Sequence, residues 1–285
     1  MALKFLERLT LFASQLTDNA RLDASNIDNL PAFLGVTTVD TLGELQAITG
    51  TSTSDIRYVD SVGRFKWDGA AWQPIDRPVT PEMFGAVGDG VTDDTSAFNA
   101  AMAAQLEVVG GAKTYAVTLL EPQTGTVLSF PGSGSAKLKS IAAAGISTID
   151  DRPNTATNWT LRGVTVDGDV ATRGAGAGNN IFVDNDGATF DDVVTINSPN
   201  AGLLADGVNE ITYISIQANN NTGVGLSHSS VDRINGGDIR ASDNGLENLT
   251  IDGDTDIVNI NNLILGQHSG GCGNVGIDCT GDINI

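Results

Sequence analysis

Apolar residues near the start of the chain repeat at helical spacing. They alternate in steps of four and three residues, which places them on one helix face: Phe5, Leu9, Phe12 and Leu16. The stripe is broken after Asp18 and covers about two heptads, too short for a stable isolated coiled coil. It therefore predicts a helix that contacts another subunit or a partner protein. A single amphipathic helix packed on its own chain is the alternative.

A different pattern begins near residue 38. Residues 38–45 predict a short helix with Asp40 or Thr41 as its N-cap. The alternating residues that follow predict short strands over 57–59, 64–67 and 70–72. Asp68-Gly69 lies between the last two, and an Asp-Gly pair favours a type I′ hairpin turn.

The two tryptophans beside this turn, Trp67 and Trp72, are candidates for the core of a small module. We predict a compact β-rich unit over residues 38–76, followed by a linker that Pro74 and Pro78 mark.

Short apolar pairs recur in the second half of the chain at a period of mostly about 20 to 25 residues, which is typical of solenoids. One set comprises Val164/Val166, Val194/Ile196, Ile214/Ile216, Ile239, Leu263/Leu265 and Ile283/Ile285. A second comprises Ile181/Val183, Leu203, Val224/Leu226, Leu246 and Val275/Ile277. A third, looser set comprises Leu161, Phe190, Ile211, Val231 and Ile257. Three short strands per repeat, each with alternate side chains pointing inward, predict a β-helical coil.

The turn residues agree with this solenoid. Asn-containing glycine turns precede several strands, as in Asn200-Ala201-Gly202 and Asn221-Thr222-Gly223. Corners between coil strands need left-handed φ, which Gly and Asn tolerate best. The run at 173–178 predicts a protruding loop. About six coils at the usual strand spacing would rise about 25 Å.

A glycine-rich turn followed by a helix precedes these repeats, over residues 81–104. Asp93, Asp94 or Thr95 can cap the helix, whose apolar face carries Phe98, Ala101, Met102 and Leu106. A phosphate cradle is the alternative for such a loop. It is disfavoured because no Lys-Ser/Thr follows the glycines and no G-x-G-x-x-G is present.

This stretch resembles the opening motif of the pectate-lyase-like β-helix superfamily, which many phage tailspikes share. The residues that carry the resemblance are Phe84, Gly85, Gly88, Asp89, Gly90, Asp93, Asp94 and Thr95. The resemblance implies a mostly β protein, a right-handed parallel β-helix whose open N-terminal end is covered by the capping helix. The Leu42–Leu45 and Phe65–Gly69 elements are similar, more weakly, to adaptor modules of phage tail proteins.

The resemblance also implies an organisation and partners. We expect an N-terminal helix and virion-attachment segment over 1–37, an adaptor module over 38–76 and a β-helix over 77–285, incomplete at its C-terminus. The implied protein is a homotrimer in the phage tail that contacts other tail or baseplate proteins and binds host surface polysaccharide. It would be made in the host cytoplasm without a signal peptide.

The chain is strongly acidic, with a formal net charge of −20 and a pI near 4.1. No cluster of Lys and Arg is present to neutralise phosphates, which argues against nucleic-acid binding. The same charge disfavours a densely anionic polysaccharide. No uninterrupted apolar segment predicts a signal peptide or membrane insertion. Cys272 and Cys279 are expected to be small buried residues, with a bridge or metal site as the alternative.

Polysaccharide cleavage needs either two carboxylates roughly 5 to 10 Å apart for hydrolysis, or a base and charge stabilisation for elimination. Asp206 follows Asp184 by about one repeat, so these two are the weak catalytic candidates; solvated turn residues are the alternative. Further outward carboxylates are Asp186, Asp238, Asp243 and Glu247. The available bases are Arg162, Arg173, Arg233 and Arg240, and nothing groups them.

No cofactor is expected, and the metal signals are weak. Asp252, Asp254 and Asp256, and the 184–187 run, have oxygen-ligand spacing typical of calcium loops, but lack the distal Glu of an EF-hand. His228 and His268 are expected at the surface. No catalytic constellation is evident from the sequence.

Two other functions remain open. A free secreted bacterial polysaccharide lyase or hydrolase would have the same fold, but predicts a signal peptide and no N-terminal adaptor. A purely structural virion β-helix is the second alternative, because the recognised motif is a fold motif.

Overall fold

The computed structural model describes residues 37–50, 52–53, 55–60, 62–76, 78–104, 107–143, 145–174, 178–252 and 255–266, and the strand backbone of 275–277 and 282–284. The chain divides into two compact units, the first ending at Gln73 and the second beginning at Pro74. Within the described residues, no helix is both long and apolar enough to cross a membrane.

The first unit is a small sheet with one short helix. Its elements are β1 (Thr37–Val39), α3 (Leu42–Ala47), β2 (Ile56–Val59), β3 (Gly63–Trp67) and β4 (Trp72–Pro74), and the strands are ordered β1-β2-β3-β4. Thr41 is the N-cap of α3 and forms a capping box with Glu44, which satisfies backbone N–H groups at the helix start. Leu45, Val59 and Phe65 are buried and form its core.

The loop between β3 and β4 differs from the predicted type I′ hairpin. It spans residues 68–71, and Gly69 has a φ of 110° whereas Asp68 keeps a negative φ. Asp68 Oδ1 instead accepts hydrogen bonds of 2.8 Å from the N–H groups of Ala70 and Ala71, the Asx type of turn. Trp67 and Trp72 meet edge to face with ring centroids 5.5 Å apart, but both are only half-buried, beside the core.

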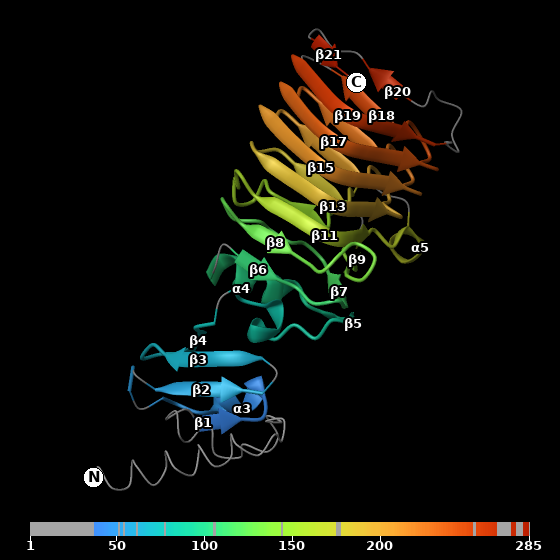
Figure 1. Ribbon diagram of the computed structural model, residues 1–285. Helices are drawn as coiled ribbons and strands as arrows, with labels where there is room; N and C mark the ends of the chain where they lie inside the picture. The colour runs from blue at the N-terminus through green and yellow to red at the C-terminus, as the bar shows by residue number, and fades with distance from the viewer. Residues whose placement is uncertain are drawn as a thin grey trace, which may run out of the picture. The chain divides into compact units, whose positions relative to one another are not determined.

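The second unit is a parallel β-helix (Figure 1). A six-stranded sheet has the order β10 (Ile149–Asp150), β12 (Ile181–Val183), β14 (Leu203–Asp206), β16 (Leu226–Ser229), β18 (Leu249–Asp252) and β20 (Val275–Ile277). The main path of an eleven-stranded sheet runs from β21 (Asp282–Asn284) through β19 (Ile257–Leu265), β17 (Arg233–Ser242), β15 (Glu210–Asn219), β13 (Ala188–Ile196), β11 (Thr160–Asp167), β9 (Lys137–Ser140) and β7 (Thr114–Val117) to β5 (Asp89–Asp93). β6 (Glu107–Val109) and β8 (Val127–Ser129) pair beside that path, and α5 is Val170–Arg173.

Each regular coil contributes one short and one long strand. Leu203, Leu226 and Leu249 pair in register, which sets a step of 23 residues. Pairing between the long strands β15 and β17 skips Ile214 and Gly237, and the inward alternation restarts after them. The first and third apolar sets therefore largely share one strand in each coil. Val231 precedes β17, and Ile283 pairs with Val258 near the start of β19.

The predicted register is wrong by one residue in part of the long strands. Val164 pairs with Val193, not with Val194, because both strands have a left-handed residue just before this pair, Gly163 and Asp192, after which the inward alternation restarts. A shift of one residue exchanges the inward and outward faces of a strand. In the short strands, Leu249 continues the inward column, whereas Leu246 is 44 % exposed.

A column of rings fills the interior along the coil axis. Trp159 packs edge to face on Phe190, and Phe190 stacks on Tyr213, with centroids 5.4 and 5.7 Å apart. His228 completes the column and is fully buried, so its predicted surface position is wrong. Its strand, β16, has inward positions at Leu226 and His228, and period-two alternation therefore carries the imidazole into the core. His268 lies outside the described residues.

The asparagine turns form a buried ladder at one corner. Asn221 Oδ1 accepts a hydrogen bond of 3.0 Å from the Ser198 N–H, and Asn244 Oδ1 accepts one of 3.0 Å from the Asn221 N–H. Their amide groups also donate to the carbonyls of Thr195 and Ala218. The predicted reason for these asparagines is wrong, because the left-handed residues are Asn220 and Asp243, directly before them. Asn221 and Asn244 instead use their side chains to satisfy backbone groups of the neighbouring coil.

Helix α4 (Thr95–Ala104) lies at the end of the stack that holds β5, β6 and β7 (Figure 1). Ala97, Phe98, Ala101 and Met102 are buried, as the predicted apolar face requires; Leu106 lies outside the described residues. Phe98 packs edge to face on Tyr115 with centroids 4.9 Å apart. The helix thereby covers apolar side chains that an open coil would leave exposed.

Candidate functional site

The two carboxylates singled out from the sequence lie on neighbouring coils. Asp184 directly follows β12, Asp206 ends β14, and the pairing of Val183 with Ala205 places the two side by side. Paired strands are about 4.8 Å apart. Asp252 continues the same column two strands further on, through Ser229.

Asp184 and Asp206 are exposed, and neither side chain accepts a hydrogen bond from any residue that the structure describes. Partial burial raises the pKa of the Asp184 carboxyl, the Arg152 guanidinium opposes this, and the negative charges of Asp206 and Asp150 raise it further. Asp184 therefore binds a proton more readily than an ordinary aspartate does.

Arg152 lies beside these carboxylates on an aromatic ring. Its guanidinium carbon is 3.9 Å from the ring centroid of Phe182. Its Nε donates to Asp150 Oδ1 at 2.9 Å, and Nη2 donates to Asp150 Oδ2. Because Asp150 pairs in register with Phe182, the acid, the cation and the ring form one unit on the outer face of the six-stranded sheet.

Asp151 supports the site from beneath. It is fully buried and accepts hydrogen bonds from the Asp184 N–H at 2.8 Å, Asn185 Nδ2 at 3.2 Å and Trp159 Nε1 at 3.1 Å. Burial raises the pKa of the Asp151 carboxyl, and these hydrogen bonds oppose the rise. Asp151 thus fixes the backbone of Asp184 on the next coil.

Asp150, Asp151 and Arg152 were not predicted as site residues from the sequence. Asp150 ends β10, the strand that pairs with β12, and the sequence signal was an acidic-basic triplet directly after Ile149. The loop between β10 and β12 makes the step between these two strands longer than the 23-residue step of the later coils. The position of this group beside Asp184 could therefore not be predicted from the repeat.

Most other outward acids have structural partners. Asp186 accepts from the Asn209 N–H at 2.7 Å, and Asp238 pairs with Arg240 at 2.9 Å and accepts from Asn262. Asp243 occupies a left-handed corner with a φ of 58°. These residues stabilise corners and strands.

The arginines considered as bases for elimination are dispersed. Arg173 donates to the carbonyl groups of Ala142, Gly168 and Ile146, while Arg240 pairs with Asp238. The register places Arg162 and Arg233 in the first half of different long strands, β11 and β17. The structure does not bring the four together.

The calcium candidates are only partly described. Asp252 ends β18 and Asp256 precedes β19, whereas Asp254 lies outside the described residues. Over the part of the chain that is described, no three His, Cys, Asp or Glu side chains are arranged to hold a metal ion.

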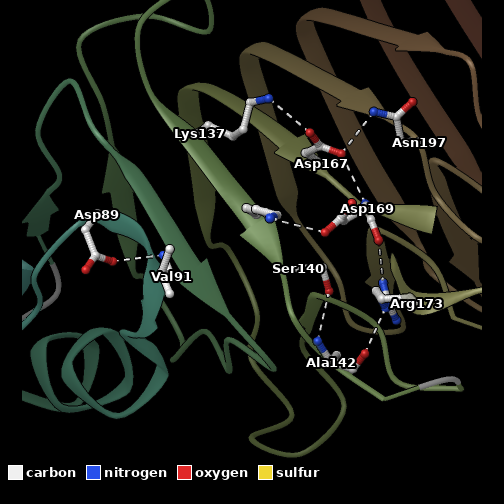
Figure 2. A network of polar contacts seen from close by, with 11 residues as sticks. Asp89, Val91, Lys137, Ser140, Ala142, Asp167, Asp169, Arg173 and Asn197 are labelled. Carbon is white, nitrogen blue, oxygen red and sulfur yellow. Dashed lines mark hydrogen bonds and ion pairs between the residues drawn. The ribbon is translucent and has the colours of Figure 1, made fainter. Parts of the chain in front are cut away.

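A second polar network lies on the long strands (Figure 2). Lys137 Nζ is 3.0 Å from Asp167 Oδ2, and Asp167 Oδ1 accepts from Asn197 Nδ2 at 3.0 Å and from the Asp169 N–H at 3.1 Å. Lys139 pairs with Asp169 at 3.3 Å. Each charge in this network has an internal partner, so the network links three neighbouring strands and offers no unpaired group.

The opening motif holds backbone turns. Asp94 is buried and accepts from the N–H groups of Val87 at 2.6 Å and Gly88 at 3.1 Å. Asp89 accepts from the Thr92 N–H, and Asp93 from the Thr95 N–H, at 2.7 and 3.0 Å. Gly88 has a φ of 70°, and a Cβ there would lie 2.6 Å from a Lys113 side-chain carbon.

The remaining motif glycines also have positive φ. Phe84 ends the 3₁₀ helix η2 (Pro81–Phe84), Gly85 caps it at a φ of 99°, and Gly90 has a φ of 75°. The proposed contact residues Phe5, Leu9, Phe12 and Leu16, and both cysteines, lie outside the described residues.

Neither a family model nor a curated protein matches the sequence. Among solved structures, ORF18 of Geobacillus virus E2 is 15 % identical, with a TM-score of 0.56 over 86 % of this chain and 60 % of that one. The enzymatically active domain of tailspike protein 2 of bacteriophage CBA120 is 14 % identical, with a TM-score of 0.51 over 95 % and 56 %. The Dettilon tailspike protein is 16 % identical, with a TM-score of 0.50 over 73 % and 47 %.

The chain thus spans between 47 % and 60 % of the length of these phage proteins. At such identities the likeness concerns the fold. This likeness agrees with the two parallel sheets, the regular coil step and the helix α4 at one end of the stack. The chain has a parallel β-helix fold, which it shares with the Dettilon and CBA120 tailspike proteins.

Proposed function

We propose that this chain is part of a phage tail protein and that it binds host surface polysaccharide on the outer face of the six-stranded sheet. The observation that carries the proposal is the pair of Asp184 and Asp206, exposed on adjacent coils and accepting no hydrogen bond from the described residues. Exposed carboxylates can accept hydrogen bonds from sugar hydroxyls. The shared fold supports the tail role by analogy.

The proposed organisation follows the sequence. Residues 1–37 attach the protein to the virion, 38–76 form the adaptor, and 77–285 form the β-helix of a homotrimer. The partners are other tail or baseplate proteins at one end and the host polysaccharide at the β-helix.

Hydrolysis is the second candidate activity, and one observation favours it. The pairing of Val183 with Ala205 puts the backbones of Asp184 and Asp206 about one strand spacing apart, ~4.8 Å. That spacing allows the ~5 Å carboxyl separation of retaining glycosidases, and the pKa of Asp184 is raised as that of an acid catalyst would be. A free secreted lyase or hydrolase and a purely structural virion β-helix are the alternatives that the tests separate.

The test is binding to a panel of purified bacterial capsular and O-antigen polysaccharides, measured by biolayer interferometry. We expect at least one to bind, and the double variant Asp184→Asn/Asp206→Asn to weaken that binding at least tenfold. Asp243→Asn is the matched control, because Asn also tolerates the left-handed corner there. Unchanged binding in the double variant would exclude this face, and an absence of binding across a broad panel would favour the structural role.

A further inference from the structure

The candidate face has an unusual charge arrangement. Among the described residues, its outer positions carry four carboxylates, those of Asp150, Asp184, Asp206 and Asp252. The same face carries one guanidinium, that of Arg152. The register positions between them are uncharged, namely Leu204, Ser227, Ser229 and Thr250.

The one cation is already paired. Arg152 makes a two-pronged hydrogen bond with Asp150, and its plane lies on Phe182. A bidentate Arg–carboxylate pair uses the geometry that an incoming carboxylate would need. Binding a carboxylated sugar at Arg152 therefore requires breaking this pair.

The surroundings add negative charge. Of the chain's 35 acidic and 15 basic residues, 26 and 9 lie in the second unit, from Pro74 onward. The lysines of the other polar network, Lys137 and Lys139, pair with Asp167 and Asp169. No compensating cation is thus supplied to this face by the residues that the structure describes.

We propose that this face selects against carboxylated sugars, so that the bound polysaccharide is built from neutral or amino sugars. The inference rests on the proposed function and names the substrate class of the same face. Sugar carboxylates would meet Asp184 and Asp206 as like charges, whereas an ammonium group would pair with them, and ring hydroxyls would donate to them. Arg152, which is paired with Asp150 over the ring of Phe182, is then no receptor for a sugar carboxylate.

The experiment compares three charge-graded probes on the full chain: hexamers of glucosamine, N-acetylglucosamine and galacturonic acid. Affinities are measured by microscale thermophoresis in 20 and 500 mM salt. We expect glucosamine hexamer to bind more tightly than N-acetylglucosamine hexamer at low salt, with this difference shrinking at high salt, and galacturonate to bind least.

Variants separate the site from the overall charge. Asp184→Asn/Asp206→Asn should weaken glucosamine binding about tenfold, whereas Asp243→Asn should leave it unchanged. Asp184→Lys should bring galacturonate binding to the level of the neutral probe or above. Equal effects of the site and control variants, or galacturonate binding as tight as the neutral probe in the unaltered chain, would overturn the inference.

If no hexamer binds, the inference is tested with the panel of capsular and O-antigen polysaccharides described above. A panel polysaccharide that binds through Asp184 and Asp206 and lacks carboxylated sugars supports the inference. One that is rich in uronate overturns the inference while leaving the proposed function standing. Failure of every probe and every panel polysaccharide overturns both.

Discussion

The buried contact between His228 and Tyr213 fixes the protonation of both rings. The carbonyl of Thr250 can only accept a hydrogen bond, so His228 Nδ1, 3.1 Å away, carries the proton and donates it. Nε2 is then an acceptor for the Tyr213 hydroxyl at 2.7 Å. Both side chains are satisfied only while the imidazole is neutral, and burial lowers the pKa of His228 to about 4.

This pair predicts an acid sensitivity of the fold. The pKa of His228 is about 4 in the folded state and about 6.5 in the unfolded state, so the unfolded chain binds more protons between these values. The free energy of unfolding should therefore fall as the pH is lowered from about 6.5 to about 4, by about 3 kcal/mol from this group, and the loss should level off below. Urea titrations at a series of pH values measure it.

Carboxylates also titrate in this range, so a matched variant is needed. Tyr213→Phe/His228→Leu removes both polar groups and leaves neither a buried donor nor a buried acceptor on these side chains. The His228 contribution to the pH dependence should disappear in this variant. If its stability falls as steeply as that of the unaltered chain between pH 6.5 and 4, the histidine is not the cause.

At the scale of elements, side chains join neighbouring coils by forming hydrogen bonds with backbone N–H and C=O groups at the corners. Asn221 is 2 % exposed and serves the coil before it through the Ser198 N–H and the Thr195 carbonyl. Asn221→Ala should lower the free energy of unfolding by about 2–4 kcal/mol, because buried backbone groups lose their partners. Urea unfolding checks this.

Asn262→Ala is the control for the ladder. Asn262 is exposed and donates one hydrogen bond to Asp238, so its loss should cost less than about 1 kcal/mol. If both variants lose a similar free energy of unfolding, burial of the asparagine ladder adds nothing to the stability of the fold.

The start of the β-helix depends on Asp94 in the same way. Its carboxylate satisfies the Val87 and Gly88 N–H groups, while exposed Asp93 satisfies only Thr95, by its N–H and hydroxyl groups. We expect Asp94→Ala to cost about 2–3 kcal/mol and Asp93→Ala about 1 kcal/mol in thermal or urea unfolding. The reverse order would mean that helix capping, rather than the glycine turn, is the main role of the motif acids.

At the scale of the whole molecule, assembly is the first property to measure. We expect multi-angle light scattering to give the mass of a trimer for the full chain, and a chain beginning at Pro74 to assemble less strongly. Loss of the N-terminal contact segment is the physical reason. A monomer in both cases would contradict self-assembly through this segment and leave assembly on the virion.

Several elements of this protein were predictable because their causes are local. The alternation of apolar residues at a period near 23 and the apolar face of α4 each follow from conformational preference within a few residues. The stacking of Asp184 beside Asp206 follows from the same period, since equal coil lengths bring equal positions together.

The sequence by itself therefore determined the coil and its opening turn, as well as the negative charge of the chain. Only the tertiary structure decided the register of the long strands, because the inward alternation restarts after Asp192 and Ile214 and so changes which residues face inward. Only it placed His228 inside, and only it brought Asp150, Asp151 and Arg152 to Asp184 across a long first coil step. These contacts join residues whose separation along the chain follows no fixed period, so geometry in three dimensions had to set them.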